Sequence, residues 1–446
     1  MFSKFSLRRE DKKIWWVFGG SMLLAFILSI LMILLDTRAV PLLDNFPDWI
    51  LTNVSTAKEV LSTLAGTLFT VTTFVFTAML TIISLYTSNF SPRAVENFLL
   101  DDISIRTLGL FLGGFVYCLT SLVFMQDLPD VELVISAIWA WLYAVGSVIY
   151  FTKFVYQASN FVQVEKLVNQ LYEEADDVYS KNIDYFMEKT RINQLPELET
   201  TYQYQIKAKT EGYIGNVYFE KLTEISKEYK GACLITVQVG AFISKHQPFA
   251  TFYTNVSISD AQKFTTLVNE TFDFESERSA RYDSSYTRNK LNEIALKAIS
   301  PAINDPNTAI HAIHYKSLLE AKFAALEGRY VVFGDHHKGQ AESIESKDYI
   351  GTVIYQYNDF LKNIHHGYRQ LVHYMKEDIS CIEAIFEALI LIAHAAHEDK
   401  LDYVKEYSRY AYESTIDLFP LPLDRRIIEA KYQEILNISA DQRKGY

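Results

Sequence analysis

The sequence predicts an α-helical membrane protein with four transmembrane helices and an α+β cytoplasmic domain, which contains a small β module and a helical C-terminal part. Two observations support this fold class. Four long apolar runs lie near the start of the 446-residue chain, whereas the remainder combines short β-like runs with amphipathic helical patterns. With 49% hydrophobic residues and a mean hydropathy of +0.03, the chain is too apolar for a purely soluble protein and too polar for a purely membrane one.

The changes of pattern also give the expected domain boundaries. They are residues 1–155 for the four-span transmembrane domain, 156–200 for an amphipathic linker helix, 201–258 for a small β-rich module and 259–446 for a mainly helical cytoplasmic domain.

The four apolar runs are long enough to cross a bilayer as helices. They are Ile14–Leu35, Ser62–Ser91, Thr107–Met125 and Leu133–Phe151. A basic segment precedes the first run, and the loop after it is mainly acidic, so the positive-inside rule places the N-terminus and the C-terminal domain in the cytoplasm. The first run exceeds a usual signal-peptide core, which favours a retained anchor over a cleaved signal.

Charge and cysteine content exclude several classes of partner. A net charge of -12 argues against nucleic acid, because phosphate binding relies on clustered Lys and Arg. The three cysteines, Cys118, Cys233 and Cys381, form no CxxC pair, which is typical of reduced thiols rather than of a disulfide framework or a zinc site. No ionisable side chain lies inside the four runs, which counts against a carboxylate-coupled pump.

The second run carries hydroxyl side chains along one helical face. This stripe consists of Thr63, Thr67, Thr70, Phe74, Thr77, Thr81, Ser84 and Ser88. A hydroxyl face gains nothing from lipid, so we expect it to meet water or other helices. It is either the lining of a pore with Phe74 as a hydrophobic constriction, or a seam of small residues that lets helices approach closely. Further hydroxyls lie off the stripe, as at Thr72 and Thr73, which favours the seam slightly.

The fourth run is expected to continue as a helix beyond the membrane. An apolar pattern with alternating spacings of four and three extends from Phe154 to Val178, into sequence rich in Asp and Glu. The pattern fits a coiled-coil seam between subunits, and it fits equally well an amphipathic helix that packs on its own cytoplasmic domain.

Short β-like runs follow Pro196, punctuated by glycines. They are Tyr202–Ile206, Gly212–Tyr218, Cys233–Val239 and Phe249–Tyr253. The segment 240–249 loosely resembles the turns of small biotinyl/lipoyl-type β modules. No turn of that kind offers a lysine for a swinging arm, so we expect a purely structural barrel.

A helix junction at residues 298–309 dominates the C-terminal part. One helix is expected to end at Ser300-Pro301, and the next to begin with Asn304 or Asp305 as N-cap and Pro306 in its first turn. A free helix start of this kind can bind an anion, although it is more often simply capped. A ligand site is therefore a hypothesis here, built from residues that we expect to converge. They are Arg278, Asp283, Ser300, Asn304, Asp305 and Thr308.

Neither a metal nor a cofactor is expected. The histidine pairs, of which His311 and His314 are one, lack the acidic partners of a zinc motif. The segment Gly334–Gly339 has the glycine spacing of a P-loop, but Gln340 stands where the lysine belongs, so we reject nucleotide hydrolysis. No nucleophile elbow or Rossmann fingerprint is present in the sequence, and we expect a protein that is not an enzyme.

Several motifs together resemble a bacterial family of predicted membrane proteins known only as domain of unknown function, family 2254. They are Ser300-Pro301-Ala302-Ile303-Asn304-Asp305-Pro306 with Thr308-Ala309, Ser91-Pro92-Arg93 leading to Asp101, Gly212-Tyr213, and Arg278 with Asp283. The sequence departs from the family pattern at Ser279, Tyr286 and Ala241. The resemblance implies four spans in the bacterial inner membrane and a cytoplasmic domain, and it supplies no activity.

The leading functional hypothesis is a homo-oligomeric channel, in which the second helices of several copies line a pathway for ions in the lipid bilayer. A ring of copies is needed because one striped helix cannot enclose water. The alternative is a membrane-anchored scaffold or sensor whose cytoplasmic domain binds a ligand or a protein. A third, weaker hypothesis is a membrane-bound enzyme that uses Arg278, Asp283 and Asp305.

Overall fold

The computed structural model consists of two compact units, Met1–Lys166 and Leu167–Tyr446, which we call the membrane unit and the second unit. The residues that the structure describes are 9–40, 46–89, 102–161, 164–195, 197–278, 282–334 and 349–439. The predicted fold class is confirmed, since four candidate membrane-spanning helices precede a mixed region of sheets and helices.

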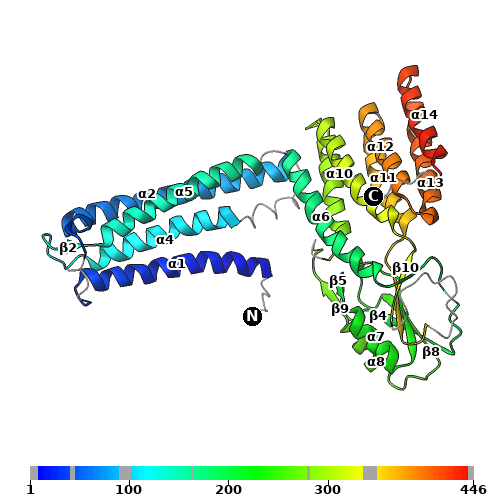
Figure 1. Ribbon diagram of the computed structural model, residues 1–446, viewed down its shortest axis with the longest axis horizontal. Helices are drawn as coiled ribbons and strands as arrows, with labels where there is room; N and C mark the ends of the chain where they lie inside the picture. Colours follow the sequence, from blue (N-terminus) through cyan, green and yellow to red (C-terminus); the bar gives the residue numbers. More distant parts are fainter. Residues whose placement is uncertain are drawn as a thin grey trace. The chain divides into compact units, whose positions relative to one another are not determined.

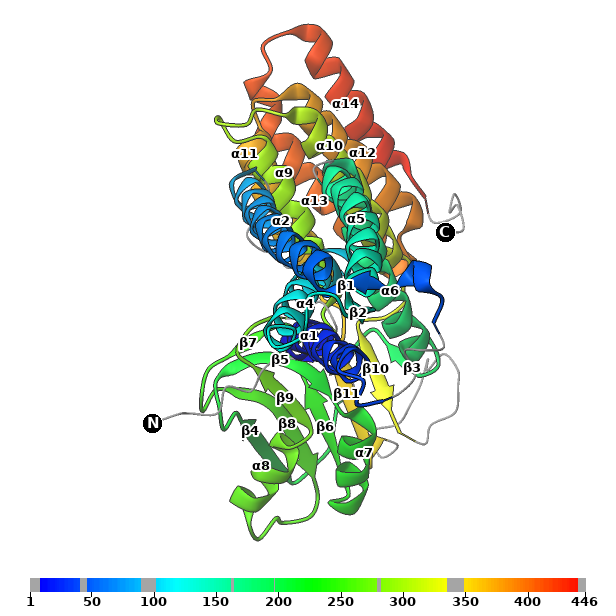
Figure 2. The ribbon, with the colours of Figure 1, turned by 90° about the vertical axis from the view of Figure 1, so that its left-hand side faces the viewer.

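The part of the membrane unit that the structure describes contains four long helices that run side by side (Figures 1 and 2). They are α1 (Arg9–Asp36), α2 (Val54–Asn89), α4 (Asp102–Phe124) and α5 (Ser136–Phe161). Each contains a stretch long and apolar enough to span a membrane. α2 begins eight residues before the predicted start at Ser62, because Val54, Ala57 and Leu61 are already buried in the unit. The Ser91-Pro92-Arg93 motif and Asp101 lie outside the described residues.

Helix α4 approaches its neighbours closely through glycines. A Cβ atom at Gly109 would lie 2.6 Å from Ser21 Oγ of α1, and one at Gly114 would lie 2.9 Å from Leu68 Cδ1 of α2. One at Gly113 would lie 2.6 Å from a tyrosine hydroxyl on α5. Small residues allow this approach between transmembrane helices. The glycines of the third span therefore serve packing inside the unit.

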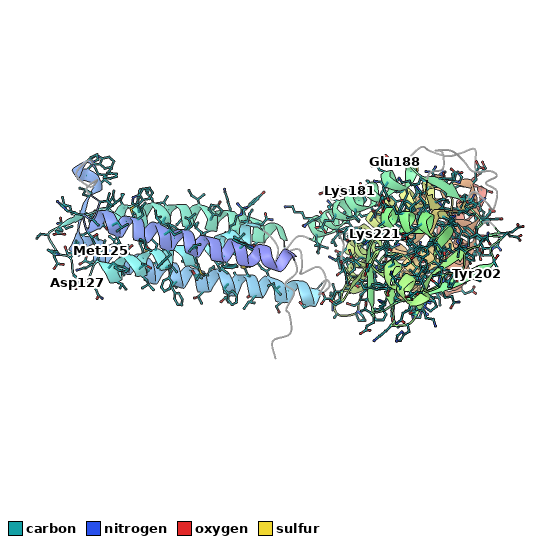
Figure 3. All side chains as sticks on the ribbon, turned by 90° about the horizontal axis from the view of Figure 1, so that it is seen from below. Met125, Asp127, Lys181, Glu188, Tyr202 and Lys221 are labelled. Atoms are coloured by element: carbon teal, nitrogen blue, oxygen red, sulfur yellow. The ribbon has the colours of Figure 1, made fainter. Side chains whose placement is uncertain are left out.

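Asp36 joins α1 to the beginning of α5. The sequence places Asp36 among the acidic side chains of an external loop, but the residue is only 1% exposed. Its carboxylate accepts hydrogen bonds from the backbone N–H of Ile135, at 2.8 Å, and from the Ser136 hydroxyl. Two short antiparallel strands, β1 (Thr52–Asn53) and β2 (Leu133–Val134), lie at this end of the bundle, where Figure 3 also labels Met125 and Asp127. The carboxylate thus satisfies N-terminal donors that α5 cannot satisfy itself.

Among its described residues, the second unit contains two β-sheets. Their strands are β3 (Thr190–Ile192), β4 (Tyr202–Lys207), β5 (Gly212–Val217), β6 (Gly231–Ile235), β7 (Phe242–Ile243), β8 (Pro248–Thr254), β9 (Phe272–Glu275), β10 (Tyr330–Phe333) and β11 (Thr352–Gln356). The larger sheet has the order β3-β10-β11-β6-β8-β4, and the smaller has the order β7-β5-β9. The pair β11–β6 is parallel, whereas the other pairs are antiparallel.

The prediction of a self-contained structural barrel at residues 201–258 is wrong, because strands of this segment belong to a larger sheet. Three of its strands, β4, β6 and β8, are hydrogen-bonded into one sheet with β3, β10 and β11, which lie outside that range. The reason is that β6 is buried along its whole length, with alternate residues in two different core clusters. Cys233 and Ile235 contribute to one cluster, whereas Ala232 and Leu234 contribute to the other. A strand buried on both faces needs neighbours at both edges and cover on both sides.

Nine α-helices of the second unit are described, and Figures 1 and 2 show α9 to α14 grouped beside the sheets. They are α6 (Val164–Met187), α7 (Phe219–Glu228), α8 (Ala261–Asn269), α9 (Ser284–Ala298), α10 (Pro306–Ala325), α11 (Phe360–Met375), α12 (Ile379–Ala395), α13 (Glu398–Thr415) and α14 (Pro422–Asn437). Residues of α6, α7 and α8 cover one face of the larger sheet, where they share a core with its strands.

The helix after the fourth span packs on the second unit rather than presenting a free seam. α5 ends at Phe161 and α6 begins at Val164, and the two residues between them lie outside the described ones. The apolar face of α6 is buried, and its last buried residue, Tyr179, packs against Phe323 in a tilted arrangement with ring centroids 4.0 Å apart. Of the two interpretations of the pattern, the amphipathic helix is therefore the one that fits α6.

Lys400 is a buried cation whose replacement we expect to stabilise the protein. It is 3% exposed, and its Nζ atom has no hydrogen-bond partner among the described residues. Burial lowers the pKa of Lys400 to about 8. We expect Lys400→Met to raise the free energy of unfolding by about 1 to 2 kcal/mol at pH 7, because no charge then needs to be desolvated.

The pH dependence gives the sign of this effect. The folded-state pKa lies below the ordinary value of 10.5, so the unfolded chain binds the extra proton. The stability of the natural chain should therefore rise between about pH 8 and pH 10.5, and Lys400→Met should remove the part of that rise that comes from Lys400. Urea unfolding at pH 7 and pH 9.5 measures this change in the free energy of unfolding for the natural chain and for the variant. The matched control is Lys221→Met at an exposed position of α7 (Figure 3), and equal effects of the two variants would contradict the prediction.

Candidate functional sites

The hydroxyl stripe lies on the outer surface of the membrane unit. Each of its eight residues is exposed, and Phe74 is 60% exposed. They are Thr63, Thr67, Thr70, Phe74, Thr77, Thr81, Ser84 and Ser88. The buried side of α2 carries Ala65, Leu68 and Val75 instead, and at about 3.6 residues per turn this side is opposite the stripe. A packing seam inside one chain is therefore wrong for this face, whereas a seam or a pore between copies fits it.

Four of the five threonines of the stripe donate a hydrogen bond to a carbonyl of their own helix. Thr67 Oγ1 donates to the carbonyl of Thr63 at 2.8 Å, and Thr81 Oγ1 donates to that of Thr77 at 2.9 Å. A hydroxyl that donates in this way keeps a lone pair that can accept a further hydrogen bond. The Thr and Ser side chains are also short, so they do not project far from the helix. Phe74 has one aromatic neighbour on α5, Phe151, at a centroid distance of 6.3 Å. The face can therefore contact a second copy closely, or offer oxygen atoms to water.

In the second unit, the half-buried Arg278 and the buried Asp283 form a clamp at the start of α9. Asp283 is 5% exposed and caps α9, since its Oδ1 accepts from the backbone N–H of Ser285 at 3.0 Å. Arg278 donates to Oδ2 from Nε at 2.9 Å and from Nη2 at 2.5 Å. Gly240, at φ +83°, lies against the same carboxylate. The linker that follows β6 therefore packs closely against the carboxylate that caps α9.

The predicted junction is a capped helix start, as its sequence indicates. Asp305 is the N-cap of α10: its Oδ1 accepts from Thr308 N at 3.2 Å, and Thr308 Oγ1 donates to its Oδ2 at 2.6 Å. Ser300 Oγ donates to the Lys297 carbonyl at 2.6 Å. Asn304 has φ +50°, which its short polar side chain tolerates. Local capping thus accounts for the polar residues of the junction.

The expected convergence of Arg278, Asp283 and Asp305 is wrong. Asp283 precedes α9, whereas Asp305 follows it. The 15 residues of α9 separate the two carboxylates by about 22 Å at 1.5 Å per residue. The six residues therefore do not form one shared site. An enzyme site built from Arg278, Asp283 and Asp305 is ruled out for the same reason, because the three side chains do not meet.

Two adjoining cavities that the sequence did not reveal lie beside the clamp. The first has a volume of about 350 Å³ and is lined by many aromatic side chains, and we call it the aromatic chamber. Six of its lining residues are Tyr179, Phe186, Phe219, Phe323, Tyr355 and Tyr357. The second has a volume of about 200 Å³, and we call it the cationic chamber. Its basic lining residues are Arg278, Arg288, Lys316, Lys362 and His366.

A buried ion network lines the cationic chamber, and one of its members, Arg288, also lines the aromatic chamber. Glu320 is 3% exposed and accepts from Arg288 Nη1 at 2.8 Å and from Lys316 Nζ at 3.2 Å. Burial lowers the pKa of Lys316 to about 8, although Glu320 opposes this shift. Burial also raises the pKa of Tyr355 to about 12, so its ring stays neutral at ordinary pH. The sequence held one signal: Arg288 shares a helical face with Leu291 and Ala295, where an apolar residue is expected.

The histidines take part in separate local contacts. His314 Nε2 lies 3.2 Å from Glu387, and His397 Nδ1 lies 2.7 Å from Asp399. Within the described ranges, no group of three or more His, Cys, Asp or Glu side chains could hold a metal ion. His336, His337 and most of the P-loop-like segment lie outside those ranges.

The two units together define a multi-pass membrane protein with four candidate spans. The chain belongs to the family described as "Predicted membrane protein (DUF2254)", whose model matches residues 11–390. Similar uncharacterized proteins occur in Mycobacterium bovis and Mycobacterium tuberculosis, each 22% identical over 363 residues. These alignments cover 76% of this chain and 64% of each relative's length. No solved structure matches the chain.

Proposed function

We propose that the protein is a homo-oligomeric, channel-like integral membrane protein in which the hydroxyl stripes of α2 from several copies surround a pathway for ions. Its N-terminus and its second unit lie in the cytoplasm in this proposal, which assigns the protein no enzymatic reaction. The single observation that carries it is the position of the stripe: all eight residues are exposed on the side of α2 opposite the buried one.

The chemistry of the stripe fits an ion pathway better than a lipid contact. Hydroxyl oxygens can replace part of the hydration shell of an ion, and polar side chains on a lipid-facing surface gain nothing comparable. Phe74 interrupts the stripe as a large apolar side chain. In a ring of copies, these phenylalanines form a hydrophobic constriction of the kind that gates by excluding water.

We expect Phe74→Ala to raise ion flux through liposomes containing the purified full chain by about tenfold, which corresponds to a barrier lower by ~1.4 kcal/mol. Thr77→Val, which removes one hydroxyl without changing the size of the side chain much, should lower the flux. Single-channel current and a fluorescent flux assay measure both effects.

The matched control is Phe76→Ala on the same helix. Phe76 is 51% exposed but lies off the stripe, so its truncation should leave the flux unchanged. The proposal fails if no form conducts under voltage, tension or pH change, or if the natural chain is a stable monomer in detergent. Equal effects at Phe74 and Phe76 would show that the constriction is misplaced.

A further inference from the structure

The aromatic chamber has the size and the lining of a small-molecule site. Its volume of about 350 Å³ falls within the range of about 300 to 1,000 Å³ found for ligand pockets. Its aromatic walls are themselves well packed: Phe219 stacks on Phe333 with centroids 4.1 Å apart. Amide side chains are set among the rings, and they are Asn182, Asn216, Gln238 and Asn363. A flat ring with polar edges matches this combination.

The cationic chamber adjoins the first and supplies positive charge. The two share the lining residues Gln238 and Val239 after β6, Arg288 of α9 and Asn363 of α11. Four Arg and Lys side chains line the cationic chamber, whereas Asp283 and Glu320 are the carboxylates bonded to three of them. An excess of positive charge therefore remains, and it includes the exposed Lys362.

Two buried polar groups at the chambers also lack partners. The hydroxyl of Tyr179, a residue 2% exposed, forms no hydrogen bond to any described residue. Arg288 is 8% exposed, and its Nε likewise has no partner among the described residues. Buried polar atoms are nearly always hydrogen-bonded in native proteins. Both residues line the aromatic chamber.

We propose that the two chambers form one binding site for a small organic phosphate that carries a planar aromatic ring, the chemistry that nucleotides share. The ring occupies the aromatic chamber, where the amides contact its polar edges. The phosphate occupies the cationic chamber near Arg288 and Lys362. This site is independent of the proposed pore, and it involves binding without hydrolysis.

A phosphate suits the cationic chamber for two reasons. Guanidinium groups donate N–H bonds to phosphate oxygens, and Arg278 and Arg288, which both line the chamber, each carry more N–H donors than their bonds to Asp283, Ser285 and Glu320 use. Lys362 and His366, one helical turn apart on α11, add further donors from the opposite element. The carboxylates of Asp283 and Glu320 are already occupied by their own arginines and by Lys316, so they hold the cations in place.

Isothermal titration calorimetry of the full chain in detergent tests the proposal. The probes are AMP and phenyl phosphate, with adenosine and inorganic phosphate as the two separate halves of AMP. We expect AMP or phenyl phosphate to bind, and each half to bind at least tenfold more weakly. Binding of AMP alone assigns the site to nucleotides, and binding of phenyl phosphate as well assigns it to aryl phosphates in general. Affinity should fall as salt is added.

Two variants locate the binding in the chambers. Lys362→Ala should weaken it about fivefold, whereas Lys245→Ala, also at an exposed lysine, should leave it unchanged. Asn363→Trp fills the wall that the chambers share and should abolish binding. The proposal is overturned if neither AMP nor phenyl phosphate binds at about 1 mM, or if binding survives both Lys362→Ala and Asn363→Trp.

Discussion

Gly240→Ala is expected to lower the free energy of unfolding of the second unit by about 3 kcal/mol. Gly240 has φ +83°, a conformation that alanine adopts only under strain. In addition, the new Cβ would lie 1.9 Å from Asp283 Oδ2, so the carboxylate must move. The movement breaks the double hydrogen bond from Arg278 and the cap of α9 together.

The matched control is Gly351→Ala, because Gly351 has the same φ of +83°. Its Cβ would lie 3.0 Å from Lys227 Cγ, part of a flexible side chain that can shift. We therefore expect a loss of about 1 kcal/mol from backbone strain alone. Pulse proteolysis of the full chain in urea measures both variants. Equal losses would show that the Asp283 clamp contributes nothing beyond the conformational strain.

The features that the sequence predicted depend on neighbours in the chain. The four spans follow from length and apolarity, and Asp305 follows from the positions of cap residues relative to Pro306. The stripe on α2 follows from helical spacing, since residues three and four apart share a face. Spacing alone could not distinguish a pore lining from a packing seam, because it does not show whether this face of α2 is buried against other helices of the chain.

The features that the sequence analysis did not predict depend on contacts between residues far apart in the chain. β6 pairs with β11 across more than a hundred residues, and no local pattern records such a partner. In the sequence, Asp36 is one of several acidic residues in a predicted loop. In the structure, its carboxylate accepts a hydrogen bond from the backbone N–H of Ile135, at the start of another helix. The chambers combine residues from α6 to α11 in the same way. Of the residues that line the chambers, the sequence analysis predicted only Arg278 and Asp283 as site residues, and it grouped them with Asp305, which lies at the other end of α9.

Glu320→Gln is expected to destabilise the second unit by about 3 to 5 kcal/mol, because it leaves two buried cations without a counter-charge. Lys316 Nζ lies 3.4 Å from the centre of the Tyr368 ring, and Arg288 Cζ lies 4.2 Å from that of Phe323. These rings shield the cations from water but compensate only part of a full charge. The amide keeps the size of Glu320, so the loss reports charge rather than a cavity.

The pH dependence of this loss follows from Lys316. Its folded-state pKa of about 8 already lies below the ordinary 10.5, so the unfolded chain is the form that binds more protons between these values. Removing the Glu320 charge lowers the folded-state pKa further. The destabilisation in Glu320→Gln should therefore be greatest at neutral pH and should shrink as the pH rises and Lys316 loses its proton.

Glu387→Gln provides the comparison, since Glu387 contacts His314 and Lys431 on an exposed surface, at 3.2 and 2.9 Å. An exposed pair of this kind contributes at most about 1 kcal/mol, and the loss should change little between pH 8 and pH 10. Urea unfolding of both variants at these two pH values separates the cases. If Glu320→Gln costs no more than Glu387→Gln, then water reaches Arg288 and Lys316 in solution, and the three charges do not form a buried network.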